Sequence, residues 1–439
     1  MILIISIVLL LIDSFLVIKI VKSNYFHLLL RLFWVISFFG WNAIPFLLSL
    51  LPKYKGDISI NYEFYISCWA MNLFFLFIVY SSAMLFNKRG WKLDNLFTKP
   101  SYQYNPRFIK MIMNISIIIL ILIITIGLNN TATYTERNDV GNHDDNLLLG
   151  TISFFRGYVV YFLLAILFFY QKILSQFQRF VIIGLLSLHY IMIAFAGSRI
   201  HLFAILIILV YVAISQKKTR LMIPIIAVGF FAFTLLPTIS ELRKTGDTFT
   251  TSDVIQARPR DSGDILWEVM NKTNSVHSSS TLLYFSGIGS GGSLVYTSTL
   301  YSLFPRFIYP NKPHPGSMDG TMDGLPGRLA ANINSTKYSS VANVGIATSM
   351  EALWAGGFIM FILQALFSGI LITLMNIAIK GKKLLFLYFV LSLLSFPVCT
   401  LDVSLVYFSV SIQRFLIVCM VFYILFSGIY GKNSMPKSS

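Results

Sequence analysis

The sequence predicts an all-α polytopic membrane protein, and three observations carry this prediction. The chain has 439 residues, of which 56% are hydrophobic and only 12% are charged, whereas about 25% of the residues of a typical soluble domain are charged. Its mean hydropathy is +0.74. Several apolar runs approach or exceed the roughly 20 residues that a helix needs to cross a bilayer. Together these values exclude a water-soluble globular enzyme and a disordered chain.

Eleven apolar segments fit membrane-spanning helices. In chain order they cover residues 2–21, 32–51, 64–86, 111–128, 150–171, 180–197, 200–215, 221–239, 346–378, 384–401 and 409–430. The first of them runs into Lys19 and Lys22 without a small-residue cleavage site, so we expect a retained helix and not a signal peptide. The chain thus divides into eight helices within 1–239, a large loop at 240–345, and three helices with a short tail within 346–439.

The basic residues predict the orientation of these helices. The net charge is +16, but the cations lie at the ends of apolar segments and not on a soluble face, which argues against a nucleic-acid partner. Alternate connections hold nineteen Lys and Arg residues, with Asp94 as the only acid among them. Short connections rich in Lys and Arg face the cytoplasm. We therefore expect the amino terminus and the 240–345 loop outside and the carboxyl terminus inside.

The large outer loop is too long to be a mere connector, and loops of this length are usually functional or form a small domain. Within it, residues 281–304 are half apolar and rich in Gly and Ser, which predicts an interfacial or re-entrant piece. Its GSGGS run at 289–293 lacks the strand-to-helix context of a phosphate-binding loop. A turn is the favoured interpretation of that run.

Three arginines lie within or at the edge of predicted spans. Arg199 and Arg414 each precede the lysine that ends their helix by 18 residues, and Arg156 precedes its lysine by 16. At 1.5 Å per residue these separations are about 27 Å, 27 Å and 24 Å, which in a hydrocarbon core of roughly 30 Å reach one level near the outer headgroups. Singly, such arginines bind lipid phosphates. Together they predict a site for a lipid-linked phosphate or pyrophosphate, whose oxygens a guanidinium binds in pairs.

The outer loop adds further cations to this prediction. They are Arg243, Lys244, Arg258, Arg260, Arg306, Lys312 and Arg328. Their concentration favours a phosphate-binding loop, and the alternative is a solvated basic surface that meets anionic headgroups. His, Cys and Asp residues show no metal-ligand spacing, so we expect neither a metal nor another cofactor.

Glu351 is the acid of greatest interest. It precedes Lys380 by 29 residues, which is about 44 Å of continuous helix and more than the membrane core. The helix must therefore project outward, tilt, or bend near Gly356 and Gly357. We expect Glu351 to face an outer vestibule, and the alternative is a structural role at the helix N-terminus, where the dipole favours an acid.

Two polar residues inside other predicted spans have simpler interpretations. Asp13 lies a turn or two from Lys19, which predicts a local ion pair. We expect His189 to be a helix-packing residue and not a catalyst.

Four segments resemble Wzy-type O-antigen polymerases of bacteria. AGSRIHLFAIL (196–206) resembles the glycine-small-arginine start of a helix in that family, and FPRFIYPNKPHPGSM (304–318) resembles its aromatic- and proline-rich outer-loop element. GIATSMEALWAGGFIMFILQALFSGILI (345–372) resembles the helix that follows this loop, with an early acid and then a glycine pair. A weaker match is LDVSLVYFSVSIQRFLIV (401–418), with an arginine that enters the last helix.

The resemblance implies a metal-independent, inverting glycosyltransferase of GT-C-like architecture in the bacterial inner membrane, with its active site facing the periplasm. Such an enzyme joins undecaprenyl-pyrophosphate-linked oligosaccharide repeat units, so its partners would be the lipid-linked glycan donor and acceptor and the membrane lipids. A chain-length regulator is a further partner left open. The pyrophosphate leaving group would be stabilised by fixed cations.

The site residues implied by this resemblance follow its motifs. Arg199, Arg306 and Lys312 correspond to the pyrophosphate-binding cations, with Arg414 from the weaker match. Glu351 is the expected general base for the acceptor hydroxyl, and His314 is the alternative. Arg156 and Arg243 join the cationic group by position and charge.

Three other functions remain as alternatives. An O-antigen ligase would share the donor chemistry, and the PNKP run favours a polymerase over it. A flippase of lipid-linked glycans normally has charges deep in the membrane and short outer loops, whereas here the midplane is nearly free of charge and one outer loop is large. A scaffold or chain-length protein, with two spans and a long coiled coil, fits poorly.

Overall fold

In the computed structural model, every regular element of the described residues is helical. The structure describes residues 2–22, 62–88, 106–129, 147–195, 199–215, 275–292 and 347–381. It also describes isolated positions between 31 and 43, at 223 and 300, and between 384 and 420. The all-α class is thus confirmed for this part of the chain.

Seven long helices correspond to predicted spans. They are α1 (Ile2–Lys22), α5 (Tyr62–Lys88), α7 (Pro106–Asn129), α9 (Leu147–Phe169), α10 (Gln176–Phe195), α11 (Arg199–Ser215) and α18 (Thr348–Gly381). A single 3-10 turn, η4 (Gln171–Ile173), joins α9 to α10. The predicted spans 32–51, 221–239, 384–401 and 409–430 fall largely or wholly outside the described residues, so the total of eleven stays a prediction.

Among the described residues, four helical stretches are long and apolar enough to cross a membrane: Ile4–Lys22, Phe64–Phe86, Pro106–Ile126 and Thr348–Ile379. Large apolar side chains cover the outside of these helices, as a lipid environment requires. On α1, for example, the exposed residues include Ile4, Leu11 and Phe15. The protein is membrane-embedded.

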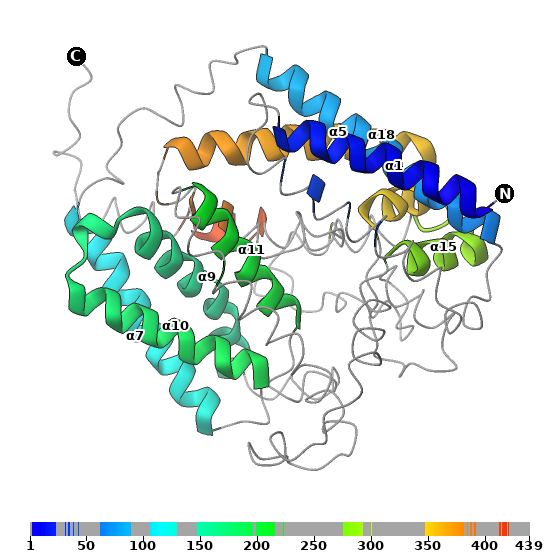
Figure 1. Ribbon diagram of the computed structural model, residues 1–439. Helices are drawn as coiled ribbons and strands as arrows, with labels where there is room; N and C mark the ends of the chain where they lie inside the picture. The colour runs from blue at the N-terminus through cyan, green and yellow to red at the C-terminus, as the bar shows by residue number, and fades with distance from the viewer. Residues whose placement is uncertain are drawn as a thin grey trace.

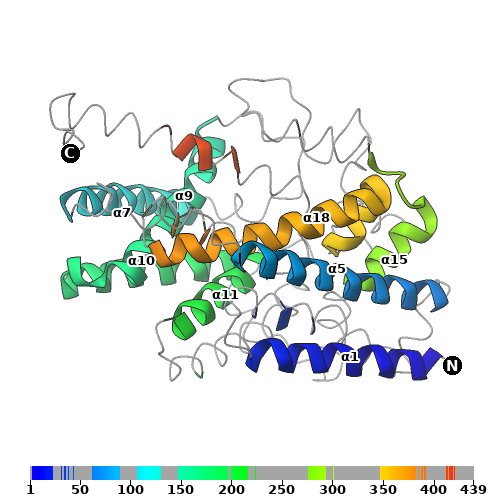
Figure 2. The same ribbon diagram turned by 90° about the horizontal axis from the view of Figure 1, so that it is seen from above.

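Helices α1, α5 and α18 run in one direction. In Figures 1 and 2 each begins on the right, where the N-terminus lies, and ends toward the left. Each ends near basic residues, namely Lys19 and Lys22, Lys88, and Lys380. This shared direction is the one that the charge pattern predicts for all three. We call the end at which α5 and α18 begin the outer end, and its extracytoplasmic location remains a prediction.

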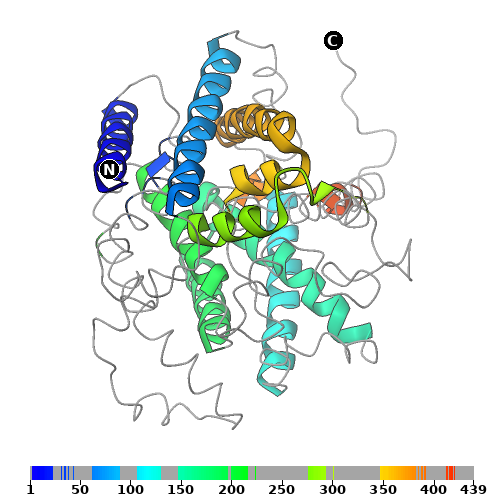
Figure 3. The same cartoon turned by 90° about the vertical axis from the view of Figure 1, so that its right-hand side faces the viewer.

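The helices pack in two groups. In the first, α18 packs along α5, α1 also packs on α5, and the helix α15 (Ser275–Ser286) packs on both α5 and α18. In the second, α7 packs on α9, and α10 packs on α7, α9 and α11. Figure 3 shows α15 at the outer end, beside the starts of α5 and α18.

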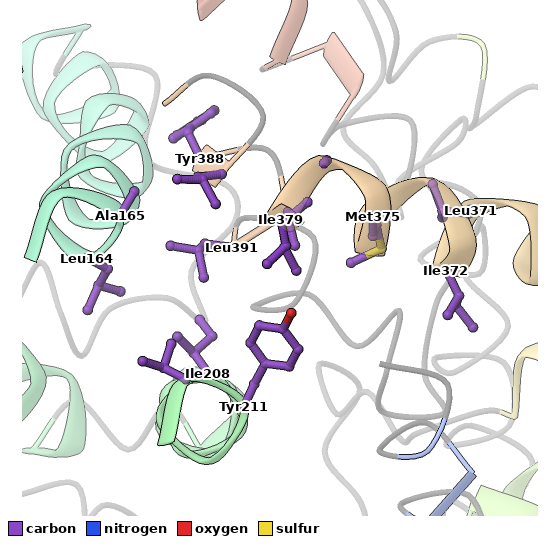
Figure 4. Close-up of a cluster of buried hydrophobic side chains, with 14 of the residues drawn as sticks. Leu164, Ala165, Ile208, Tyr211, Leu371, Ile372, Met375, Ile379, Tyr388 and Leu391 are labelled. Carbon is purple, nitrogen blue, oxygen red and sulfur yellow. The ribbon is translucent and has the colours of Figure 1, made fainter. Parts of the chain in front are cut away.

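An apolar core joins the two groups. Figure 4 shows Leu164 and Ala165 of α9, Ile208 and Tyr211 of α11, and Leu371, Met375 and Ile379 of α18 around Tyr388 and Leu391. Tyr388 stacks on Phe162 with ring centroids 4.4 Å apart. This core involves the part of α18 that leads to Lys380, away from the outer end.

Helices α5 and α18 approach closely because small residues line their contact. Ala365, Gly369 and Thr373 follow one another at intervals of four on α18, the spacing that brings helix backbones together in membranes. A Cβ atom at Gly369 would collide with the carbonyl oxygen of Val79 and lie 2.9 Å from the backbone nitrogen of Ala83. The Ser82 hydroxyl donates a hydrogen bond to the Leu366 carbonyl at 2.8 Å.

Candidate functional site

Of the eight residues predicted to form the site, Glu351 alone has a described side chain. Arg199 is the first residue of α11 and Arg156 lies in α9, but their side chains are outside the described part. The other five lie outside the described residues altogether: Arg243, Arg306, Lys312, His314 and Arg414. The predicted cationic group is therefore untested, and the geometry of the site starts from Glu351.

Glu351 lies in the first turn of α18, where its carboxylate is favoured by the helix dipole. Its side chain is 2% exposed. The expectation that it faces an outer vestibule is not met, because the side chain is buried where this end of α18 packs against α5 and α15. A carboxylate so enclosed is shielded from lipid and from bulk water.

Glu351 belongs to a buried polar cluster at the outer end. The cluster draws on α5, α15 and α18, and every member is at most 8% exposed: Tyr65, Trp69, Asn72, Ser280, Thr281, Thr348, Ser349, Glu351 and Trp354. Buried polar groups inside a membrane protein are costly unless they have partners, so a buried acid among them is a candidate for a functional role. We call this set the outer polar cluster.

The α5 part of the cluster follows helical spacing. Tyr65, Trp69 and Asn72 are separated by four and three residues, so they share one face of α5. The same face continues as Leu76 and Val79, which are buried and apolar. The next buried polar residue on this face is Ser82, whose hydroxyl bonds to α18. The sequence analysis missed these residues, although an asparagine within an apolar run was the available signal.

A hydrogen bond between side chains fastens α18 to α5 within the cluster. The Ser349 hydroxyl donates to Oδ1 of Asn72, and both side chains are fully buried. Ser349 lies in the first turn of α18, two residues before Glu351. The bond therefore fixes the helical segment that carries the acid.

Helix α18 is broken directly after this segment. Gly356 has φ −152° and ψ 24°, and Gly357 has φ 66° and ψ −156°, a conformation that is essentially restricted to glycine. Figures 2 and 3 show the first turns of α18, in yellow, set at a sharp angle to the long remainder. Of the three ways to accommodate the excess length of this helix, the bend at the glycine pair is confirmed.

The glycine-rich run after α15 forms a turn that packs on the break. The Gly289 N–H donates to the Leu353 carbonyl at 3.1 Å, and the Gly291 N–H donates to the Trp354 carbonyl at 3.0 Å. Because α18 carbonyls occupy these two amide groups, they are not available to a phosphate. The preference for a turn over a phosphate-binding loop is confirmed for this pair of donors.

Two further polar residues that the sequence analysis considered, Asp13 and His189, are both buried. Asp13 is buried and accepts a hydrogen bond from Nε1 of Trp34 at 3.1 Å, whereas Lys19 is exposed. The predicted local ion pair with Lys19 is therefore wrong, because the carboxylate points toward a neighbouring segment and not along its own helix. His189 is buried beside Tyr190, with ring centroids 5.4 Å apart, as expected of a helix-packing residue.

Within the described ranges, no three His, Cys, Asp or Glu side chains gather in a way that could hold a metal ion. The outer polar cluster contains one carboxylate together with hydroxyl, amide and aromatic groups. Such a carboxylate can accept a proton from a bound hydroxyl group. Comparison with known proteins adds no assignment: no protein-family model matches the chain, and neither a curated protein nor a solved structure matches it.

Proposed function

We propose that this chain polymerises undecaprenyl-pyrophosphate-linked oligosaccharide repeat units at the periplasmic face of the bacterial inner membrane. In this reaction a hydroxyl group of the acceptor unit attacks the anomeric carbon of the donor glycan. The new glycosidic bond forms as the bond to pyrophosphate breaks, and undecaprenyl pyrophosphate leaves. Inversion at the anomeric carbon follows from a single displacement.

The observation that carries the proposal is the buried position of Glu351. It lies at the start of a broken span, two residues after Ser349, whose hydroxyl bonds to the Asn72 amide oxygen, and at the end of the helices opposite Lys88 and Lys380. That end is the one to which the charge pattern assigns the outer leaflet, where a lipid-linked glycan presents its headgroup. A carboxylate held there can take the proton of the acceptor hydroxyl.

Cations would stabilise the leaving pyrophosphate. Arg199 begins α11 and Arg156 lies in the first half of α9, and both helices are predicted to begin at the outer face. The cations Arg306, Lys312, Arg243 and Arg414 complete the proposed group, with His314 as the alternative base. Fixed positive charge beside a departing pyrophosphate is the form of electrostatic stabilisation that this chemistry needs.

The test is deletion of the gene in its host, followed by electrophoresis of the surface polysaccharide. A polymerase deletion leaves core bearing one repeat unit and removes the long ladder. Loss of the single-unit band as well would indicate the ligase or the flippase instead. An unaltered ladder would refute the proposal.

A further inference from the structure

The break in α18 creates a local problem of hydrogen bonding. The last carbonyl groups of a helix have no partner within it, and the break at Gly356 and Gly357 places such an end inside α18. In a membrane protein a carbonyl without a partner costs several kcal/mol, to order of magnitude. The segment that carries Glu351, residues 348–355, therefore needs donors from elsewhere to be stable in this position.

The turn Gly287–Gly291 supplies these donors. Its amide groups at Gly289 and Gly291 bond to Leu353 and Trp354, the residues near the end of the segment. Gly289 adopts φ 78°, which favours glycine. The geometry of the turn is therefore matched to the broken helix.

Side-chain packing makes the match specific. A Cβ atom at Gly291 would overlap the six-membered ring of Trp354, so the indole lies directly on the backbone of the turn. Trp354 follows Glu351 by three residues, nearly one turn of the same short helix. If the indole is pushed aside, the helical turn that carries Glu351 moves with it.

We infer that the turn Gly287–Gly291 sets the position of Glu351, with Gly291 and Trp354 as positioning residues. The segment 348–355 is held from two sides, by Asn72 of α5 through Ser349 and by the turn through Leu353 and Trp354. The large outer loop thereby controls the acid of the site through its backbone. The geometric part of this inference stands alone, and its consequence for turnover rests on the proposed function.

The experiment measures a disulfide cross-link between α5 and α18, first with a substitution that displaces Trp354 and then with a second substitution that makes room for the first. Asn72→Cys and Ser349→Cys, in the full chain with Cys68, Cys399 and Cys419 replaced by alanine, place two thiols where the side chains now touch, so an oxidant should join them. Gly291→Ala should push Trp354 away and reduce the cross-linked fraction severalfold. In the chain without the paired cysteines, the same substitution should reduce polymer formation by roughly tenfold to a hundredfold, as displacement of a reacting group by about 1 Å does.

Relief of the clash and a matched control make the result specific. Trp354→Leu combined with Gly291→Ala makes room for the added methyl group and should restore much of the cross-link and of the polymer. Gly184→Ala in α10, where an added Cβ meets nothing within 4 Å, should change neither.

Each outcome has one meaning. An unchanged cross-link with Gly291→Ala overturns the inference, whatever the polymer does. A reduced cross-link with normal polymer supports the positioning of the segment and overturns the role of Glu351 in the proposed function. If Gly291→Ala does not accumulate in the membrane, recovery of accumulation by Trp354→Leu supports the inference, and continued absence overturns it.

Discussion

The α5–α18 pair and the α7–α9 pair are both contacts between long apolar helices, but their interfaces differ in kind. Between α5 and α18 lie Asn72, Ser349 and Ser82, and small residues bring the backbones together. The buried residues of α7 are almost all apolar: Phe108, Ile109, Ile112, Met113, Ser116, Leu120, Ile123 and Ile124. Because lipid provides no hydrophobic force between helices, membrane helices associate through close packing and interhelical hydrogen bonds. The α7–α9 pair thus relies on apolar packing, whereas the α5–α18 pair adds polar contacts, one of which lies two residues from Glu351.

The largest effect is expected at the close approach in the α5–α18 pair. Gly369→Leu places side-chain atoms where the Val79 carbonyl and Ala83 nitrogen already lie, so the helices must separate. We expect a loss of about 3 kcal/mol or more, at the upper end of overpacking effects, and little folded protein. Gly184→Leu on the exposed face of α10 is the control. Detergent extraction with size-exclusion chromatography measures the outcome, and equal yields of the two variants would contradict the close packing.

The next effect should fall on activity alone. Glu351→Gln keeps the size and burial of the side chain but removes the base, so we expect turnover of lipid-linked repeat units to fall by about 10²- to 10⁴-fold. Donor binding should change much less. Gln364→Leu, at a buried position of α18 beyond the break, is the control and should retain turnover. Unchanged turnover in the Glu351 variant would remove this residue as the base.

In the apolar α7–α9 pair, truncation of a buried side chain should lower the stability of the protein without lowering its turnover. Leu120→Ala in α7 removes a fully buried side chain and should cost about 2–4 kcal/mol through the cavity that it leaves. Leu122→Ala is the matched control, because Leu122 is 55% exposed. Thermal unfolding in detergent distinguishes them. The comparison of the two pairs fails if folded Leu120→Ala protein has lost turnover per molecule.

The smallest effect is expected for the hydrogen bond between Ser82 of α5 and Leu366 of α18. Ser82→Ala removes the bond to the Leu366 carbonyl, which is worth about 0.6 kcal/mol in a membrane protein. Ser81→Ala is the control, since the Ser81 hydroxyl bonds to the Phe77 carbonyl of its own helix. A loss as large for Ser81 as for Ser82 would show that the interhelical bond contributes nothing of its own.

The sequence predicts the helices well and their partners poorly. Apolar length alone places α1, α5 and α18 to within a few residues, because crossing a bilayer requires a long run of apolar residues. The excess length after Glu351 and the glycine pair likewise predict the bend in α18. The contact between Asn72 and Ser349 joins residues 277 positions apart, and no periodicity within either helix specifies it.

The same limit applies to the site. Glu351 was predicted from its place in one helix, whereas its burial depends on α5 and α15, which pack on α18 only in the folded chain. Asp13 shows the error that follows from local reasoning: Lys19 is near in sequence, but Trp34 is the donor in space. The neighbours of a polar residue in a membrane are decided by helix packing.

The turn at Gly287–Gly291 is synthesised before the helix that it completes. Residues 287–291 are translated before α18, so the α18 carbonyls to which the amide groups of Gly289 and Gly291 bond do not yet exist at that stage. The contact between the turn and α18 therefore forms late in biogenesis, and a nascent chain that stops before Leu353 lacks both carbonyl groups to which the turn bonds.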